Sequence, residues 1–151
     1  MALDRNVQEI RGDLWEYWED GRWIVIMTNG DTRKDGRAVM GRGTAKQAAI
    51  RFPELPVLLG DRLSVGGNKV YSFSHWHLFT FPTKQHWDDP RADLDLIETS
   101  AGLLVRLVAA LHLPRVYMVR PGCGNGGLDW AQVKPVLNRH LDERFHVVDN
   151  A

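Results

Sequence analysis

The sequence has little of what several protein classes require. Its 151 residues contain one cysteine, Cys123, which excludes an internal disulfide and any site built from several thiolates. No apolar run reaches the ~18 residues that span a bilayer, and residues 1–5 contain no apolar signal core. We therefore expect a cytoplasmic protein that does not associate with membranes.

Net charge is also absent. Nineteen Lys and Arg balance nineteen Asp and Glu, which argues against holding a long polyanion by overall positive charge. The balance hides a local asymmetry, because residues 31–51 contain six basic and two acidic side chains while residues 88–98 contain five acidic and one basic. These segments either form a polar surface near an anionic ligand or are simply two solvated stretches.

What is present predicts a single domain over residues 1–151. Hydrophobic residues make up 44% and charged residues 25% of the chain, which is an average globular composition. Apolar segments typical of strands alternate with helical patterns. We expect strands at 7–10, 23–27, 69–73, 76–81, 115–119 and 145–148, and helices at 44–51, 92–112 and 130–141.

The alternation of strands and helices predicts an α/β fold with a largely parallel or mixed sheet covered on both faces. Ligands bind such sheets at the loops beyond the carboxyl ends of the strands. Asp129 is expected to cap the final helix, and Pro135 predicts an irregular first turn there.

Two glycine-rich segments each precede an expected helix: residues 40–45 (the first loop) and residues 122–127 (the second loop). Glycine lets the backbone approach a ligand closely, and a helix N-terminus offers unpaired N–H groups to an anion. Neither segment is a Walker A motif or a G-x-G-x-x-G fingerprint. Together they predict a diphosphate held between two loops, unless each is only a tight turn between a strand and a helix.

Five segments in order resemble the macrodomain family, whose members bind ADP-ribose. They are Arg11-Gly12-Asp13-Leu14, Thr28-Asn29, the first loop Met40-Gly41-Arg42-Gly43-Thr44-Ala45, Phe81-Pro82-Thr83-Lys84-Gln85-His86-Trp87, and Gly122-Cys123-Gly124-Asn125-Gly126-Gly127-Leu128-Asp129-Trp130. The last two are similar to those of macrodomains that remove ADP-ribose from modified DNA. The resemblance implies a three-layer α/β/α macrodomain with a mixed central sheet.

The resemblance also implies roles for individual residues. Lys84 is the implied catalytic residue, Asp13 and Leu14 would read adenine, and Asn29 would orient the distal ribose. The other implied ligand-binding residues are Met40, Gly41, Arg42, Gly43, Thr44, Ala45, Thr83, Pro121, Gly122, Cys123, Gly124, Asn125, Gly126, Gly127 and Leu128.

The implied activity is an ADP-ribosyl glycohydrolase, a hydrolase that binds ADP-ribose and removes it from modified DNA (thymidine) or from modified protein. A neutral lysine amine attacks the anomeric carbon of the opened distal ribose and forms a Schiff base. An ordinary lysine is protonated at pH 7, and lowering its pKa to near 7 requires about 4 kcal/mol from burial or neighbouring cations. Phe79, Phe81 and Trp87 provide an apolar setting, and His86 is a candidate proton carrier.

One departure from the family weakens this interpretation. A subgroup carries a catalytic aspartate two residues after its Gly-Cys-Gly, and here that position is Gly126. The second catalytic group is therefore not identified. A non-catalytic ADP-ribose-binding module and an ADP-ribose 1″-phosphate phosphatase stay as alternatives.

No cofactor and no metal is expected, because His75, His77 and His86 are a weak zinc pattern. Cys123 lacks a recognisable base, and we interpret it as a small buried residue. Most of the six tryptophans should lie in the core, while Trp15, Trp18 or Trp87 are candidates for stacking on a base. We expect a monomer.

Overall fold

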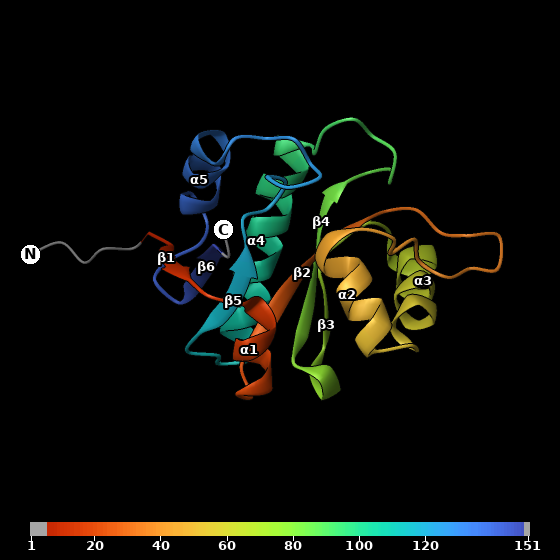
Figure 1. Cartoon of the computed structure of the whole chain (residues 1–151), viewed down its shortest axis with the longest axis horizontal. Coiled ribbons are helices and arrows are strands. Elements are labelled where there is room, and N and C mark those ends of the chain that lie inside the picture. Colours follow the sequence, from red (N-terminus) through yellow and green to blue (C-terminus); the bar gives the residue numbers. More distant parts are fainter. Residues whose placement is uncertain (1–5, 150–151) are drawn as a thin grey trace, which may run out of the picture.

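Continuous apolar segments form the central strands of one six-stranded sheet (Figure 1). The structure is a computed structural model and describes residues 6–149, so the expectation for residues 1–5 lies outside it. The strands are β1 (Gln8–Arg11), β2 (Trp23–Asn29), β3 (Tyr71–Phe73), β4 (Leu78–Lys84), β5 (Val116–Val119) and β6 (Phe145–Asp149). Their order is β1-β6-β5-β2-β4-β3.

The sheet is mixed, as expected, because β3 pairs antiparallel with β4 while the other neighbours are parallel. Successive side chains of β2 enter opposite layers: Ile24 and Ile26 join one apolar cluster, and Val25 joins the other. Both faces of the central strands are therefore buried, which explains their unbroken apolar sequence.

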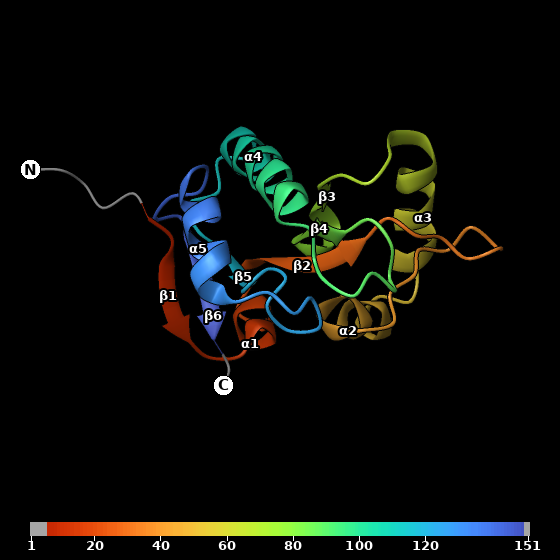
Figure 2. The ribbon, with the colours of Figure 1, turned by 90° about the horizontal axis from the view of Figure 1, so that it is seen from above.

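Helices cover both faces. They are α1 (Leu14–Glu19), α2 (Gly43–Arg51), α3 (Leu55–Gly66), α4 (Leu94–Ala110) and α5 (Trp130–Asn138). Residues of α4 and α5 pack into one cluster with the sheet, and residues of α1, α2 and α3 pack into the other. Figure 2 shows α4 and α5 on one side and α1 and α2 on the other. The expected three-layer α/β/α architecture is confirmed.

Several boundaries differ from the sequence-based expectation. The strand expected from Trp76 begins at Leu78, because residues 74–76 form a 3₁₀ turn that ends at His77 with φ 52°. The final helix ends at Asn138, and Pro135 lies inside it rather than in its first turn. That first turn is regular, since Gln132 Oε1 accepts from the Asp129 N–H at 3.2 Å and completes a capping box.

Helices α1 and α3 have no counterpart in the expected elements. Helix α3 packs against the loop that follows β2, where the Ala38 N–H donates to the Pro56 carbonyl at 2.8 Å. Among residues 6–149, no helix is long and apolar enough to cross a membrane.

Gly60 of α3 and Gly102 of α4 offer a matched pair of helical glycines. Replacing an ordinary helical glycine with alanine stabilises by about 0.5–1 kcal/mol. A Cβ at Gly102 meets His140 at 3.6 Å, an ordinary contact, whereas a Cβ at Gly60 lies 1.9 Å from the Gly36 carbonyl oxygen. We expect Gly102→Ala to raise the thermal midpoint and Gly60→Ala to lower it, measured by circular dichroism. Equal shifts of the thermal midpoint in the two variants would contradict the close packing of α3 on the loop that follows β2.

Candidate active site

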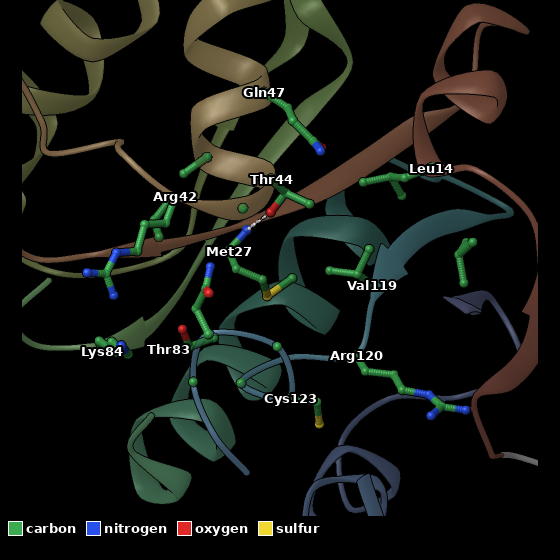
Figure 3. Close-up of a pocket in the computed structure, with 18 of the residues that line it drawn as sticks. Leu14, Met27, Arg42, Thr44, Gln47, Thr83, Lys84, Val119, Arg120 and Cys123 are labelled. Atoms are coloured by element: carbon green, nitrogen blue, oxygen red, sulfur yellow. Dashed lines mark hydrogen bonds between the residues drawn. The ribbon is translucent and has the colours of Figure 1, made fainter. Parts of the chain in front are cut away.

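A cavity of about 1240 Å³ lies at the edge of the sheet where the parallel strands end. Its lining comes from the segments after β1, β2, β4 and β5, the end of β6 and the start of α2. This is the position expected for a ligand in an α/β sheet, and the volume exceeds the roughly 300–1,000 Å³ of common small-molecule pockets. Figure 3 shows Thr83, Lys84 and Arg42 at one side of the cavity and Leu14 and Arg120 at the other.

Lys84 is the only charged residue among residues 6–149 that is buried, with 9% of its surface exposed. Within that part of the chain, its ammonium group has no carboxylate partner within ion-pair distance. Lysine is almost never this buried unless it is paired, and the ammonium group of Lys84 is open to the cavity rather than sealed inside the protein. A fold that keeps such a group at the wall of a cavity indicates a functional role for it.

An irregularity in the sheet brings Lys84 to the cavity. The register of β2 and β4 passes from Thr28 opposite Pro82 to Asn29 opposite Lys84, which leaves Thr83 as an extra residue. Such a bulge redirects side chains and is common beside active sites. As a result, the consecutive residues Thr83 and Lys84 both line the cavity.

The first loop presents the start of α2 to the cavity. Lys46 N–H donates to the Arg42 carbonyl at 3.1 Å as the first helical bond, so the N–H groups of the three residues before it have no helical acceptor. Thr44 fixes the loop on the sheet, because its Oγ1 accepts from the Met27 N–H at 2.9 Å (Figure 3). The helix begins with an arrangement suited to an anion.

The second loop folds back on itself between β5 and α5. The Leu128 N–H donates to the Gly122 carbonyl at 2.9 Å, and the Ala92 N–H donates to the Gly126 carbonyl at 2.8 Å. A Cβ on Gly43 would lie 3.7 Å from Asn125 Nδ2. The two loops therefore approach each other across the cavity, as required for a diphosphate held between them.

Gly126 has a structural reason to be glycine. A Cβ at this position would lie 2.4 Å from the Gly122 carbonyl oxygen and 2.7 Å from its Cα. The loop as folded has no room for the aspartate that a subgroup of the implied family carries here.

A carboxylate fixes the segment after Lys84. Asp31 accepts from the Trp87 backbone N–H through Oδ2 and contacts His86 Nδ1 through Oδ1, both at 2.8 Å. The hydrogen bond and the charge of Asp31 raise the pKa of His86 above its ordinary value of 6.5. Burial alone would raise the pKa of Asp31, but the bonds from His86 and Trp87 outweigh it and lower that pKa. His86 does not line the cavity, so the expected proton carrier positions the segment instead.

The pair predicts a pH dependence of stability. Because the pKa of His86 is raised in the folded chain, protonated His86 stabilises the folded state through its contact with Asp31. This stabilisation is complete below pH 6.5 and is lost as the pH rises through the raised pKa. The drop in thermal midpoint caused by His86→Ala should therefore be larger at pH 5.5 than at pH 9. An NMR titration should place the pKa of His86 closer to 6.5 in Asp31→Asn than in the wild type, and an unchanged value would contradict the pairing.

The opposite end of the cavity lies beside β1 and β6. Asp13 caps α1, where its Oδ1 accepts from the Trp15 N–H at 3.0 Å. Arg120 Nη2 lies 3.3 Å from Asp149 Oδ2, and its guanidinium lies 5.2 Å from the Trp130 ring centre. Three strand spacings, about 14 Å in total, separate β4 from β6. The cavity can therefore hold a ligand that extends across four strands.

Most of the predicted site residues line the cavity. They are Asp13, Leu14, Asn29, Gly41, Arg42, Gly43, Thr44, Ala45, Thr83, Lys84, Gly122, Cys123, Gly124, Asn125 and Gly126.

The side chain of Asn29 is held by two hydrogen bonds. The Val39 carbonyl accepts from its Nδ2 at 3.1 Å, and the Asp31 N–H donates to its Oδ1 at 2.9 Å. This leaves one amide hydrogen and one lone pair for a ligand.

Four predicted residues lie in or directly beside the two loops without lining the cavity: Met40, Pro121, Gly127 and Leu128. Met40 and Leu128 pack in the two apolar clusters instead. Trp15 and Trp87, two of the three tryptophans expected as stacking candidates, line the cavity, and so do Gln47, Val119, Arg120 and Asp149, which no sequence motif predicted. The sequence could have indicated Val119, Arg120 and Asp149, because they lie at or directly after the ends of the strands expected at 115–119 and 145–148. Ligands bind α/β sheets at the carboxyl ends of such strands.

Two minor possibilities do not fit the geometry. His75 and His77 precede β4 and His86 follows it, and residues 6–149 contain no cluster of three or more side chains suited to a metal. Cys123 lines the cavity, but burial raises the pKa of its thiol, which disfavours the nucleophilic thiolate.

Comparisons with known proteins agree with this geometry. No protein-family model matches the chain. The DNA ADP-ribosyl glycohydrolase of Mycobacterium tuberculosis is 35% identical over 112 residues, which are 66% of this chain and 30% of that protein. The chain spans 30% to 40% of the length of the curated relatives that it matches.

Solved structures extend the similarity over nearly the whole chain. The macrodomain of Mycobacterium tuberculosis DarG superimposes with a TM-score of 0.76 at 26% identity, covering 96% of this chain and 98% of that one. Thermosipho africanus DarTG in complex with ADP-ribose gives a TM-score of 0.76 at 21% identity, covering 98% of this chain and 42% of that one. With its three-layer architecture and its cavity between two glycine loops, the chain has the macrodomain fold and is similar to the macrodomain of DarG.

Proposed function

We propose that this chain is an ADP-ribosyl glycohydrolase that removes ADP-ribose from a modified nucleobase in DNA, with Lys84 as the attacking group. The observation that carries the proposal is the largely buried side chain of Lys84, which has no ion-pair partner among residues 6–149 and lies at the wall of a cavity between two glycine loops. The name of the Mycobacterium tuberculosis relative and the ligand of the Thermosipho africanus neighbour support it.

The ligand would lie across the strand ends. The diphosphate would accept hydrogen bonds from the backbone of both loops, because the start of α2 supplies unpaired N–H groups. Adenine would occupy the end beside Asp13 and Leu14, and the distal ribose would lie between Asn29 and Lys84. The anomeric carbon would then face the amine.

The reaction proceeds through a covalent intermediate. When the distal ribose ring opens, its anomeric carbon is doubly bonded to the nitrogen of the base, and Lys84 Nζ adds to that carbon. The bond to the base breaks, and the base leaves with the proton that the amine gives up. The carbon remains doubly bonded to Nζ until water adds, the bond to Nζ breaks, and the amine and the sugar aldehyde are released.

The protons of these steps would be carried by water. The carboxylates that line the cavity, within the described part of the chain, are Asp13 and Asp149. Both belong to the β1 and β6 end, several strands away from Lys84. The carboxylate of Asp31 binds His86 and the Trp87 N–H in the segment after Lys84, but it does not line the cavity. This supports a mechanism in which no carboxylate of the cavity wall acts beside Lys84, in keeping with glycine at position 126.

Charge near the cavity supports a DNA substrate rather than a protein. Arg33, Lys34 and Arg37 are exposed in the loop that follows Asp31, which contacts the segment after Lys84. Phosphate groups flanking a modified nucleotide would pass these side chains. We also propose that the chain acts as a cytoplasmic monomer, because one chain supplies a complete cavity.

The proposal is tested with three substrates whose products are followed by mass spectrometry: a single-stranded oligonucleotide carrying ADP-ribosylated thymidine, an ADP-ribosylated protein, and ADP-ribose 1″-phosphate. We expect repeated release of ADP-ribose from the oligonucleotide. Release from the protein alone would overturn the DNA assignment. Binding of ADP-ribose without any turnover would identify a binding module, and release of phosphate alone would identify a phosphatase.

A further inference from the structure

Trp87 is exposed in a way that the other tryptophans are not. Trp15, Trp18, Trp23, Trp76 and Trp130 all belong to the two apolar clusters or pack against them, whereas Trp87 belongs to neither. It is 46% exposed. Among the exposed large apolar residues of the described chain, which are Ile50, Val57, Val65, Trp87 and Leu111, it alone lines the cavity.

The fold holds this exposed side chain in place. The Trp87 N–H is bound by Asp31, and the preceding His86 N–H donates to Asp89 Oδ2 at 3.0 Å. The guanidinium of Arg42 lies 5.5 Å from the centre of the Trp87 ring, a distance suited to a cation–π contact. Arg42 and Trp87 therefore link the first loop to the segment after Lys84, and both line the cavity.

The position of Trp87 decides what it can contact. In the proposed binding mode, ADP-ribose extends from the β1 and β6 end toward Lys84, so the group attached to the anomeric carbon leaves at the Lys84 end. Trp87 lies three residues after Lys84 and lines that end of the cavity. The leaving group therefore passes the exposed indole.

We propose that Trp87 determines specificity by stacking on the planar nucleobase of the leaving group, with Arg42 holding the indole in place. This inference rests on the proposed function and adds the residue that selects the aglycone. A base can stack on a protein ring only when it has left the duplex, so the fitting substrate is a single strand or a flipped nucleotide. An ADP-ribosylated carboxylate side chain of a protein offers no ring to stack.

The test separates contacts with the base from contacts with ADP-ribose. In a Lys84→Met background, which prevents turnover, affinities for an oligonucleotide carrying ADP-ribosylated thymidine and for free ADP-ribose are measured with and without Trp87→Ala. Stacking on one base predicts about a 10- to 100-fold loss for the oligonucleotide. The affinity for ADP-ribose should change less than about twofold, and Trp87→Phe should retain most of the oligonucleotide affinity.

Kinetics of the active protein provide a second readout. Trp87→Ala should raise KM for the oligonucleotide by a similar factor and change kcat less, because Lys84 is untouched. Val65→Ser, which alters an apolar residue that is 91% exposed on α3, is the control and should leave both constants unchanged. Equal losses for the oligonucleotide and ADP-ribose, or no loss for either, would overturn the role of Trp87. Absence of turnover in the wild type would instead count against the proposed function, while the binding comparison would still test Trp87.

Discussion

Lys84→Ala is expected to lower kcat for release of ADP-ribose by about 10³-fold or more, because it removes the atom that forms the covalent intermediate. Binding of ADP-ribose should persist, since the backbone of the two loops supplies the contacts with the diphosphate. The folded protein should be at least as stable as the wild type, because the change removes the only buried charged side chain of residues 6–149. Turnover, calorimetric binding and the thermal midpoint measure the three effects.

Two further substitutions separate charge from nucleophilicity. Lys84→Met keeps the length and apolar stem of the side chain, and Lys84→Arg keeps the positive charge. Both should be inactive if the amine attacks the sugar. If Lys84→Arg retained activity, the residue would act through its charge and the covalent step would be wrong. A large loss of thermal stability in Lys84→Met would indicate a structural role.

Gly126→Asp should abolish ligand binding and turnover together, even though it introduces an acid that some macrodomains carry. The new Cβ would lie 2.4 Å from the Gly122 carbonyl oxygen, which also accepts the Leu128 N–H. The second loop must rearrange to relieve this contact, at a cost of about 1–3 kcal/mol. For a chain of this size, we expect the thermal midpoint to fall by about 3–10 °C.

Gly124→Ala is the matched control for the fold of the loop. It adds one methyl group to the same segment, and no heavy atom lies within 4 Å of the new Cβ. Its thermal midpoint should stay close to that of the wild type, whereas Gly126→Ala should reproduce the destabilisation of Gly126→Asp. If Gly126→Asp instead raised turnover without a loss of stability, the chain would use the family carboxylate after all.

The parts of the site predictable from sequence are those with local signals. The glycines of the two loops lie between an apolar segment and a helix, and Asp129 precedes its helix directly. Lys84 could be identified only through its resemblance to a family segment. Neither its burial nor the bulge at Thr83 has a local signature, because both depend on pairing of β4 with β2.

The missed features depend on contacts between distant residues. Asp31 and His86 are 55 positions apart, so no spacing rule connects them. Helix α3 contains Gly60, which lowers helix propensity, while Pro56 lies in its first turn, where proline is tolerated. Leu55, the first residue of α3, is fully buried and stabilises the helix through packing. Helix α1 has only six residues, too few to show a helical period.

Reductive trapping tests the central claim most directly. The protein is incubated with the ADP-ribosylated oligonucleotide and cyanoborohydride, and its intact mass and peptides are then analysed. The mechanism predicts a stable adduct of one ADP-ribose on Lys84 in the wild type and no adduct at that site in Lys84→Met. Continued release of ADP-ribose with no trapped adduct, or an adduct on another lysine in both proteins, would contradict it.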